Sequence, residues 1–120
     1  MSRERGNIMN FYDKIHGLVK ELKDTPEYVN YMIIKEKVKA DVDLSSKIKN
    51  FRERQRTEQM KYINGSQMDE KVKAELQHEY SIIIQNPLAV EFFQAEIKLD
   101  VLLADMQKIL GEGLKDVVEF

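Results

Sequence analysis

The sequence predicts an all-α protein, a bundle of about five helices with long helical hairpins. The chain of 120 residues has only two prolines and five glycines, too little turn material for a β-sandwich with its many turns. Hydrophobic residues make up 42% and charged residues 33%, which excludes both a disordered polyampholyte and a membrane protein. Apolar residues recur at spacings of three and four along most of the chain, the period of one helical face.

The first two helices are expected on either side of a start signal at residues 24–27. The signal, Asp24-Thr25-Pro26-Glu27, combines capping residues, a proline at the first helical position and an acid in the first turn. The helix before it runs from about Ile8 to Lys23, with one apolar face: Phe11, Ile15, Leu18 and Leu22, widened by Tyr12 and Val19. The helix after it runs from Pro26 to about Ala40, with its own stripe: Tyr28, Tyr31 or Met32, Ile34, Lys35 and Val38.

Two further helices are predicted between residues 41 and 85. Asp41 can cap a helix from about Val42 to Ile63, with a stripe of Leu44, Ile48, Phe51, Gln55 and Tyr62. Asn64-Gly65-Ser66 ends it, because Asn and Gly accept the left-handed conformation of a helix C-cap. Ser66, with Asp69 three residues later, resembles a capping box for a fourth helix that ends near Gln85. The fourth stripe is Met68, Val72, Leu76, Tyr80 and Ile83.

The fifth helix has the broadest apolar face. Asn86-Pro87 repeats the cap-then-proline start, and a helix from Pro87 to Leu110 would be about 36 Å long. Its spacings alternate between four and three, and further apolar residues thicken the stripe: Phe93, Ile97, Leu103 and Leu110. Gly111-Glu112-Gly113 is expected to break or fray the helix, with a final turn over residues 114–120. The chain is thus one helical domain over 1–120, with a flexible N-terminus (1–9) and a frayed C-terminal tail (111–120).

The breadth of this face predicts a homo-oligomer, most simply a dimer, because one partner helix needs only a narrow seam. The expected oligomer interface is Leu88, Phe92, Ala95, Leu99, Leu102, Leu103, Met106 and Ile109. The alternative is that the first two helices cover the face within one chain. Charge supports pairing of helices: residues 47–61 hold six basic and two acidic residues (+4), and residues 87–120 hold three lysines and seven acids (−4). The basic residues flank both sides of the third stripe: Lys47, Arg54 and Lys61 on one side, and Lys49, Arg52 and Arg56 on the other.

No grouping of catalytic residues stands out, so no enzymatic activity and no cofactor is expected. The absence of cysteine excludes disulfides, thiolate zinc sites and cysteine-held clusters supplied by this chain. Gly111-x-Gly113 is too short and wrongly placed for a phosphate loop. Two carboxylate–histidine pairs at a spacing of three could belong to a metal-binding helical bundle, with two further carboxylates: Asp13 with His16, Glu75 with His78, and Glu36 and Glu96. Such pairs arise often by chance in a glutamate-rich chain, so this stays the weaker alternative.

A basic face of the third helix offers an alternative function. Lys49, Arg52 and Arg56 could contact RNA phosphates, or a partner protein, along one side of that helix. Interleaved aromatic residues and glycines are missing from this run, and acids interrupt it. A solvated or salt-bridged helix face is therefore the favoured interpretation, and nucleic acid is the less favoured partner.

The segment Asn86-Pro87-Leu88-Ala89-Val90-Glu91-Phe92-Phe93-Gln94-Ala95-Glu96, followed by Leu99, Leu102, Leu103 and Ile109, resembles the YlbF/YmcA/YheA family of small helical bacterial proteins. Upstream, Glu27-Tyr28, Tyr31, Ala40-Asp41, Ile48, Phe51 and Gln55 fit the same pattern, and Asn10-Phe11-Tyr12-Asp13 resembles the YheA branch. The resemblance covers roughly residues 10–110. It implies an all-α fold with long helices, often in intertwined or paired chains.

For YlbF and YmcA, the resemblance implies a regulatory adaptor role alongside a third protein, with influence on RNase Y-dependent RNA processing. Their complex is associated with iron–sulfur clusters held by cysteines. Since this chain has no cysteine, neither cluster binding nor membership of that complex is carried over.

The sequence therefore predicts a non-catalytic, homo-oligomeric interaction or regulatory adaptor protein of the bacterial cytoplasm. The cytoplasm is expected because no uncharged run is long enough to span a bilayer and the polar N-terminus lacks the apolar segment of a signal peptide. The net charge of −2 gives no global field that would favour nucleic acid.

Overall fold

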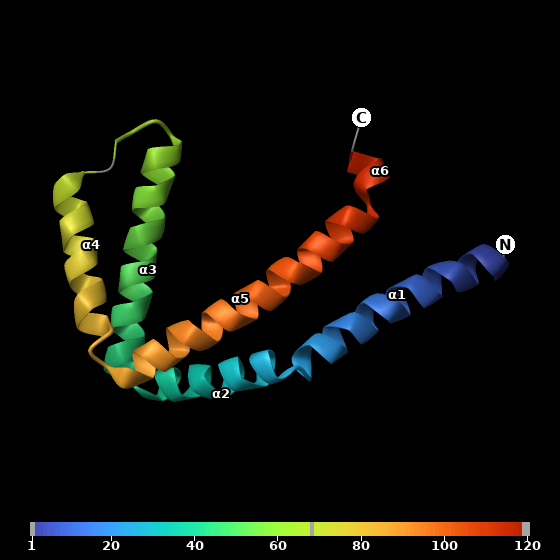
Figure 1. The fold of residues 1–120 in the computed structure, drawn as a ribbon, viewed down its shortest axis with the longest axis horizontal. Coiled ribbons are helices and arrows are strands. Elements are labelled where there is room, and N and C mark those ends of the chain that lie inside the picture. The colour runs from blue at the N-terminus through green and yellow to red at the C-terminus, as the bar shows by residue number, and fades with distance from the viewer. Residues whose placement is uncertain (1, 68, 119–120) are drawn as a thin grey trace.

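The structure, a computed structural model, describes residues 2–67 and 69–118. The described part holds six helices and no strand: α1 (Ser2–Lys23), α2 (Pro26–Ala40), α3 (Val42–Ile63), α4 (Glu70–Ile83), α5 (Pro87–Gly113) and α6 (Lys115–Val118). They form a V with two arms (Figure 1). One arm is the antiparallel hairpin of α3 and α4, and the other contains α5 beside α2, with α1 continuing outward from α2. The predicted all-α class and the long helical hairpins are confirmed.

Side-chain caps start three of the long helices where the sequence indicated. Thr25 accepts a hydrogen bond from the backbone N–H of Tyr28 at 3.3 Å. Asp41 ends α2 and caps α3, accepting from the N–H of Leu44 at 3.1 Å. Asn86 accepts from Leu88 N–H at 3.0 Å ahead of Pro87. Each cap satisfies a backbone donor that has no partner inside the helix, which fixes the point where the chain changes direction.

Several helix boundaries differ from the predicted ones. α1 begins at Ser2 rather than near Ile8, and α5 continues through both glycines to Gly113 instead of ending at Leu110. A glycine inside a helix costs only about 1 kcal/mol relative to alanine, so a long helix can run through it. α4 spans Glu70–Ile83 rather than reaching Gln85, and its N-cap is Asp69 rather than Ser66.

The physical reason for the later start of α4 is a local competition between caps. The Asp69 carboxylate accepts from the N–H of Lys71 at 2.9 Å, so it satisfies the donor itself. Gly65, with φ of 93°, adopts the left-handed conformation that was expected after α3. Met68, placed in the fourth stripe from the sequence, lies outside the described residues, as do the last two residues of the predicted final turn. Flexibility of residues 1–9 stays a prediction.

The core lies at the elbow, where the two arms of the V meet. The buried residues that form it come from α2, α3, α4 and α5: Ile34, Val38, Leu44, Ile48, Ile83, Ala89, Phe92 and Ala95. Ala89 is completely buried, and the Tyr31 ring of α2 stacks on Phe92 of α5 at a centroid distance of 5.6 Å. At the elbow, four helices thus share apolar contacts.

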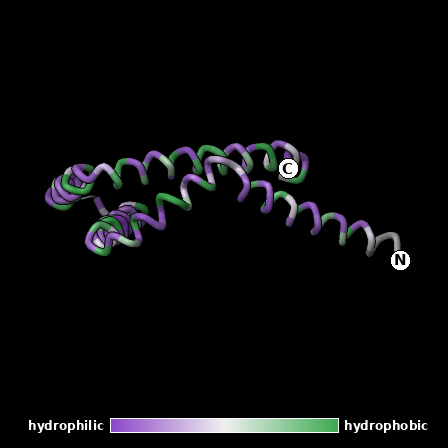
Figure 2. The backbone as a smooth tube through the Cα atoms, turned by 90° about the horizontal axis from the view of Figure 1, so that it is seen from below, coloured by the Kyte–Doolittle hydropathy of each residue, from purple (hydrophilic) through white to green (hydrophobic). Residues whose placement is uncertain are grey.

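Away from the elbow, the chain is far more extended than a compact monomer. Its radius of gyration is 19.9 Å, whereas a compact chain of this length has about 14 Å. Its accessible surface is 9938 Å², against about 6,700 Å² for a folded monomer of 14.1 kDa. Figure 2 shows the N-terminal end of α1 lying beyond the C-terminal end of α5. Many of the exposed large hydrophobic side chains lie on α1 and on the far half of α5, which together we call the outer arm.

Phe92→Ala should lower the free energy of unfolding by about 3–4 kcal/mol, because it opens a cavity in the elbow core. The control is Ile63→Ala, at a position 74% exposed at the end of α3, which should change the free energy of unfolding by about 0.5 kcal/mol or less. Urea denaturation followed by circular dichroism, at one fixed protein concentration, measures both. Equal losses in the two variants would contradict a core centred on the elbow.

Candidate functional site

Three of the carboxylates first considered for metal chemistry form ion pairs. Glu75 binds Arg54, Glu96 binds Arg52, and Glu36 lies 3.7 Å from Lys39. His16 and His78 are exposed on the surfaces of α1 and α4. Within residues 2–67 and 69–118, no group of three or more His, Cys, Asp or Glu side chains is placed to hold a metal ion. The apolar surfaces of α1 and α5 are candidate functional features.

None of the helices in the described part of the chain combines the length and the apolar character needed to cross a membrane.

α5 carries apolar residues on two separate faces. At about 100° per residue, one line continues from the buried Phe92 and Leu99 to the far end of the helix. We call the part of this line beyond Leu99 the distal face: Leu102, Leu103, Met106, Ile109 and Leu110. A second line lies on roughly the opposite side of the helix, and we call it the outer track: Phe93, Ile97, Val101 and Ala104.

The residues predicted to form an oligomer interface divide at the middle of α5. Phe92, Ala95 and Leu99 are buried in their own chain, so they offer no free surface to a second one. Leu88 is half-buried and packs on the same core. Leu102, Leu103 and Met106 are half-buried, and Ile109 is 69% exposed. The alternative of cover within one chain therefore applies to the members of this predicted set up to Leu99, and the members beyond Leu99 keep exposed surface.

α1 carries an apolar stripe that its own chain leaves uncovered. Ile8, Phe11, Ile15 and Leu18 are all 40% exposed or more. The helix packs on α2 near their junction and otherwise extends away from the molecule (Figure 1). Because an isolated helix of this length is only marginally stable in water, a stripe of this kind favours cover by another surface.

A groove with a volume of about 530 Å³ lies between α3, α4 and the start of α5. Its apolar wall is built from Phe51, Leu76, Tyr80, Phe93 and Ile97, so it runs directly into the outer track. The Tyr80 ring lies 5.8 Å from Phe51 and 5.9 Å from Phe93, centroid to centroid. Polar side chains form the rest of the lining: Arg52, Gln55, Gln59, Lys73, Gln77 and Glu96. We call this feature the elbow groove.

Arg52 holds α3 to α5 rather than facing solvent. It forms an ion pair with Glu96, and its guanidinium lies 5.4 Å from the Phe92 ring centroid and 5.7 Å from that of Phe93. The same neighbourhood affects Tyr31, whose pKa is raised first by burial and then by the negative charge of Glu96. Arg52 is therefore engaged in packing, while Lys49 and Arg56 are exposed. The basic face considered for RNA is thus split, with its central cation paired.

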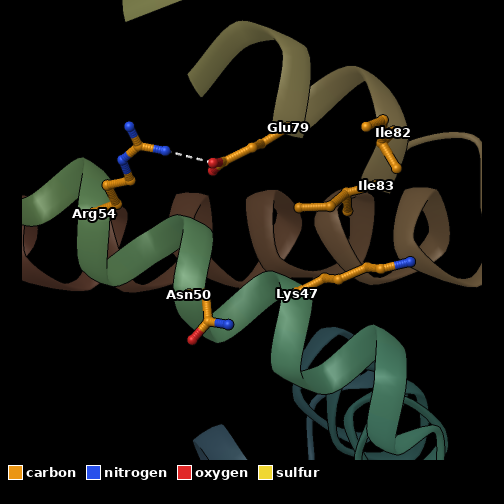
Figure 3. A pocket seen from close by; sticks show the side chains of 6 residues that line it. All are labelled: Lys47, Asn50, Arg54, Glu79, Ile82 and Ile83. Atoms are coloured by element: carbon orange, nitrogen blue, oxygen red, sulfur yellow. Dashed lines mark hydrogen bonds and ion pairs between the residues drawn. The ribbon is translucent and has the colours of Figure 1, made fainter. Parts of the chain in front are cut away.

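Arg54 plays the corresponding role between α3 and α4. Figure 3 shows it reaching from α3 to Glu79 of α4, at 2.5 Å, and it also binds Glu75. The hydrogen bond that Arg54 donates to Glu75 is the largest cause of a further rise in the pKa of Arg54, so this side chain stays charged. The neighbouring pocket of about 280 Å³ is lined by Lys47, Asn50, Arg54, Glu79, Ile82 and Ile83. Its other cation, Lys47, is paired with Asp43 at 3.0 Å.

Sequence reasoning did not find the elbow groove or the outer track. The sequence pattern assigns Phe93 and Ile97 to a single thickened stripe. At 100° per residue, however, they lie about 120° and 160° from Leu99 around the helix axis. This angular separation is the signal in the sequence that could have revealed the outer track. The meeting of Phe51, Tyr80 and Phe93 had no local signal, since it depends on how three helices cross.

Residues 11–115 match the protein family described as control of competence regulator ComK, YlbF/YmcA. Three similar chains are each named UPF0342 protein. The one from Ligilactobacillus salivarius is 34% identical over 112 residues, covering 93% of this chain and 97% of the relative. The one from Symbiobacterium thermophilum is 31% identical over 103 residues, 86% and 92% of the two chains. The one from Desulfitobacterium hafniense is 30% identical over 110 residues, 92% and 89%.

A double-mutant cycle on Arg52→Ala and Glu96→Ala should give a coupling energy of about 1 kcal/mol in the free energy of unfolding. The pair joins two helices and both side chains are at least half-buried, which favours a measurable interaction. The matched control cycle uses Glu36→Ala and Lys39→Ala, an exposed pair within α2, with an expected coupling of about 0.3 kcal/mol. Urea denaturation of each set of variants gives both values. A coupling for Arg52 and Glu96 no larger than the control would contradict its role in fixing α5 against α3.

Proposed function

The chain belongs to the YlbF/YmcA family, a family linked to control of the competence regulator ComK, and from this premise we propose that it is a non-catalytic, homodimeric interaction protein with a regulatory adaptor role. The observation that carries the proposal is the far half of α5. Its distal face keeps exposed surface in a single chain, although it continues the line of residues that forms the elbow core. An adaptor works through such surfaces and needs no reactive centre.

The lengths of the two helices that pair in the second arm favour a dimer. α5 has 27 residues and α2 has 15, about 40 Å against 22 Å. α2 can therefore cover only the near half of α5. A two-fold axis through the far half would place the distal faces of two copies against each other, which makes an isologous interface.

The amount of uncovered surface also favours a large interface. The chain exposes about 3,000 Å² more than a compact monomer of its mass. Extensive obligate interfaces bury roughly 1,000–2,500 Å² on each chain. An excess of exposed area larger than this range is expected when a second copy covers much of the apolar surface of the chain.

The RNA-associated alternative has less support. Two of its three cations, Lys49 and Arg56, are exposed, but Arg52 is paired with Glu96 and lies over two aromatic rings. Binding of phosphate through Arg52 would require breaking that ion pair. Because Arg52 is paired in this way, packing within the chain explains the charge better than RNA binding does. This favours the protein-interaction function.

Met106→Asp should convert the dimer to a monomer, because it places two carboxylates, one from each copy, in an apolar interface. Light scattering of the wild type at micromolar concentration should give twice the chain mass of 14.1 kDa, and of the variant a single chain mass. Gln107→Asp, at the neighbouring exposed position, is the matched control and should stay dimeric. Circular dichroism of both variants checks that the helices persist. A wild type of single chain mass would overturn the proposed dimer.

A further inference from the structure

We propose that the elbow groove binds an amphipathic helix of a partner protein, with apolar side chains against the aromatic wall and a carboxylate beside Lys73. This inference rests on the proposed adaptor function and deepens it, because it names a site for the partner and the chemistry that the site recognises. The groove opens on the side of α5 that carries the outer track, whereas the distal face lies on a different side of that helix. Contact between two distal faces therefore leaves the groove open.

The dimensions of the groove suit one further helix. α3 and α4 form a separate antiparallel arm, and the start of α5 lies at the base of this arm (Figure 1). Along α3 the lining extends from Phe51 to Gln59, about 12 Å, and along α4 from Lys73 to Tyr80, about 11 Å. Apolar residues at i, i+4 and i+7 of a helix span about 10.5 Å, which matches both lengths. A helix packed between α3 and α4 therefore places three apolar side chains in the groove.

The apolar wall offers anchoring surface that the chain itself leaves exposed. The Tyr80 ring lies beside both Phe51 and Phe93, with centroid distances of 5.8 and 5.9 Å. Tyr80 is nevertheless 43% exposed, and Ile97 at the α5 end of the wall is 62% exposed. Aromatic side chains supply much of the affinity of protein interfaces, because they bury a large area and have few rotatable bonds. The wall therefore accounts for the affinity of a partner helix.

The charge of the lining favours an acidic partner. Arg52 and Glu96 form an ion pair with each other, so their charges cancel. Lys73 is exposed, and it forms no ion pair with any residue that the structure describes. Within the same described part of the chain, Glu96 is the only carboxylate in the lining, so one positive charge stays uncompensated. A carboxylate on the partner helix complements that charge.

Other occupants fit this chemistry less well. A nucleic-acid backbone requires several free cations, whereas much of the polar lining consists of neutral amides: Gln55, Gln59 and Gln77. The protein's own α1 has five basic and three acidic residues over Ser2–Lys23, and its net charge of +2 does not complement Lys73. An acidic amphipathic segment of a different protein satisfies both the apolar wall and the unpaired lysine.

A displayed library of helical peptides about 16 residues long tests the proposal. Apolar residues are fixed at i, i+4 and i+7, and the flanking positions vary among Glu, Gln and Lys. Peptides are selected on the wild-type protein and counter-selected on Ile97→Asn, which removes exposed apolar surface from the wall without adding charge. We expect the selected peptides to carry Glu about threefold or more as often as Lys, because only Lys73 is uncompensated in the lining.

One selected peptide is then synthesised, and its affinity for each variant is measured by fluorescence anisotropy. Lys73→Glu should lower the affinity about tenfold or more, and exchanging Glu for Lys in the peptide should restore it. The matched control is Lys98→Glu, the same charge change at an exposed position on another side of α5, with an expected effect of about twofold or less. Both lysines are exposed, and circular dichroism checks that the helices persist.

Three outcomes overturn groove binding: no selected peptide, a preference for Lys over Glu, or equal effects of Lys73→Glu and Lys98→Glu. Light scattering of the wild-type protein separates this proposal from the dimer. A dimer that selects no acidic peptide overturns groove binding while the dimer stands. A single chain mass together with peptide binding that depends on Lys73 overturns the dimer while groove binding stands.

Discussion

The shape of this molecule follows from a mismatch between two helices that share one apolar seam. The core-facing line of α5 runs from Leu88 almost to its end, but α2 covers only its first half. Where four helices meet, residues such as Ala89 and Phe92 are buried and the fold has an ordinary core. Beyond that point, α5 and α1 extend with apolar faces that the same chain covers only in part. The elbow holds the chain together, and the outer arm provides the surface on which the proposed function depends.

The charges of α3 hold the elbow in this geometry. Arg52 binds α5 through Glu96, and Arg54 binds α4 through Glu75 and Glu79, so one helix is joined to two neighbours on two of its sides. A half-buried ion pair is only modestly stabilising, but it is directional, and here it sets how the arms cross. That crossing builds the elbow groove from Phe51, Tyr80 and Phe93. Arg52, one of the three cations considered for an RNA-binding face, therefore helps to position the elbow groove.

Local sequence signals predicted the helices well, but they could not predict the tertiary geometry. The starts of α2, α3 and α5 were predicted because Thr25, Asp41 and Asn86 act within a few residues of themselves. The start of α4 was predicted wrongly because two capping residues, Ser66 and Asp69, compete over a short distance. The predicted oligomer interface combined buried and exposed positions, because periodicity shows which residues share a face of α5 but not where the covering helix α2 ends. The partners of Arg52 and Arg54 lie on other helices, 21 to 44 residues away in the chain.

The central claim is that the outer arm is ordered because a second copy covers it. Backbone hydrogen exchange along α1, measured as a function of protein concentration, tests this most directly. If the claim holds, amides between Ile8 and Val19 are protected at concentrations where the dimer forms and become unprotected on dilution, while amides of the elbow helices stay protected throughout. Protection of α1 that does not depend on concentration, or exchange at the rate of an unstructured chain at every concentration, would contradict the claim.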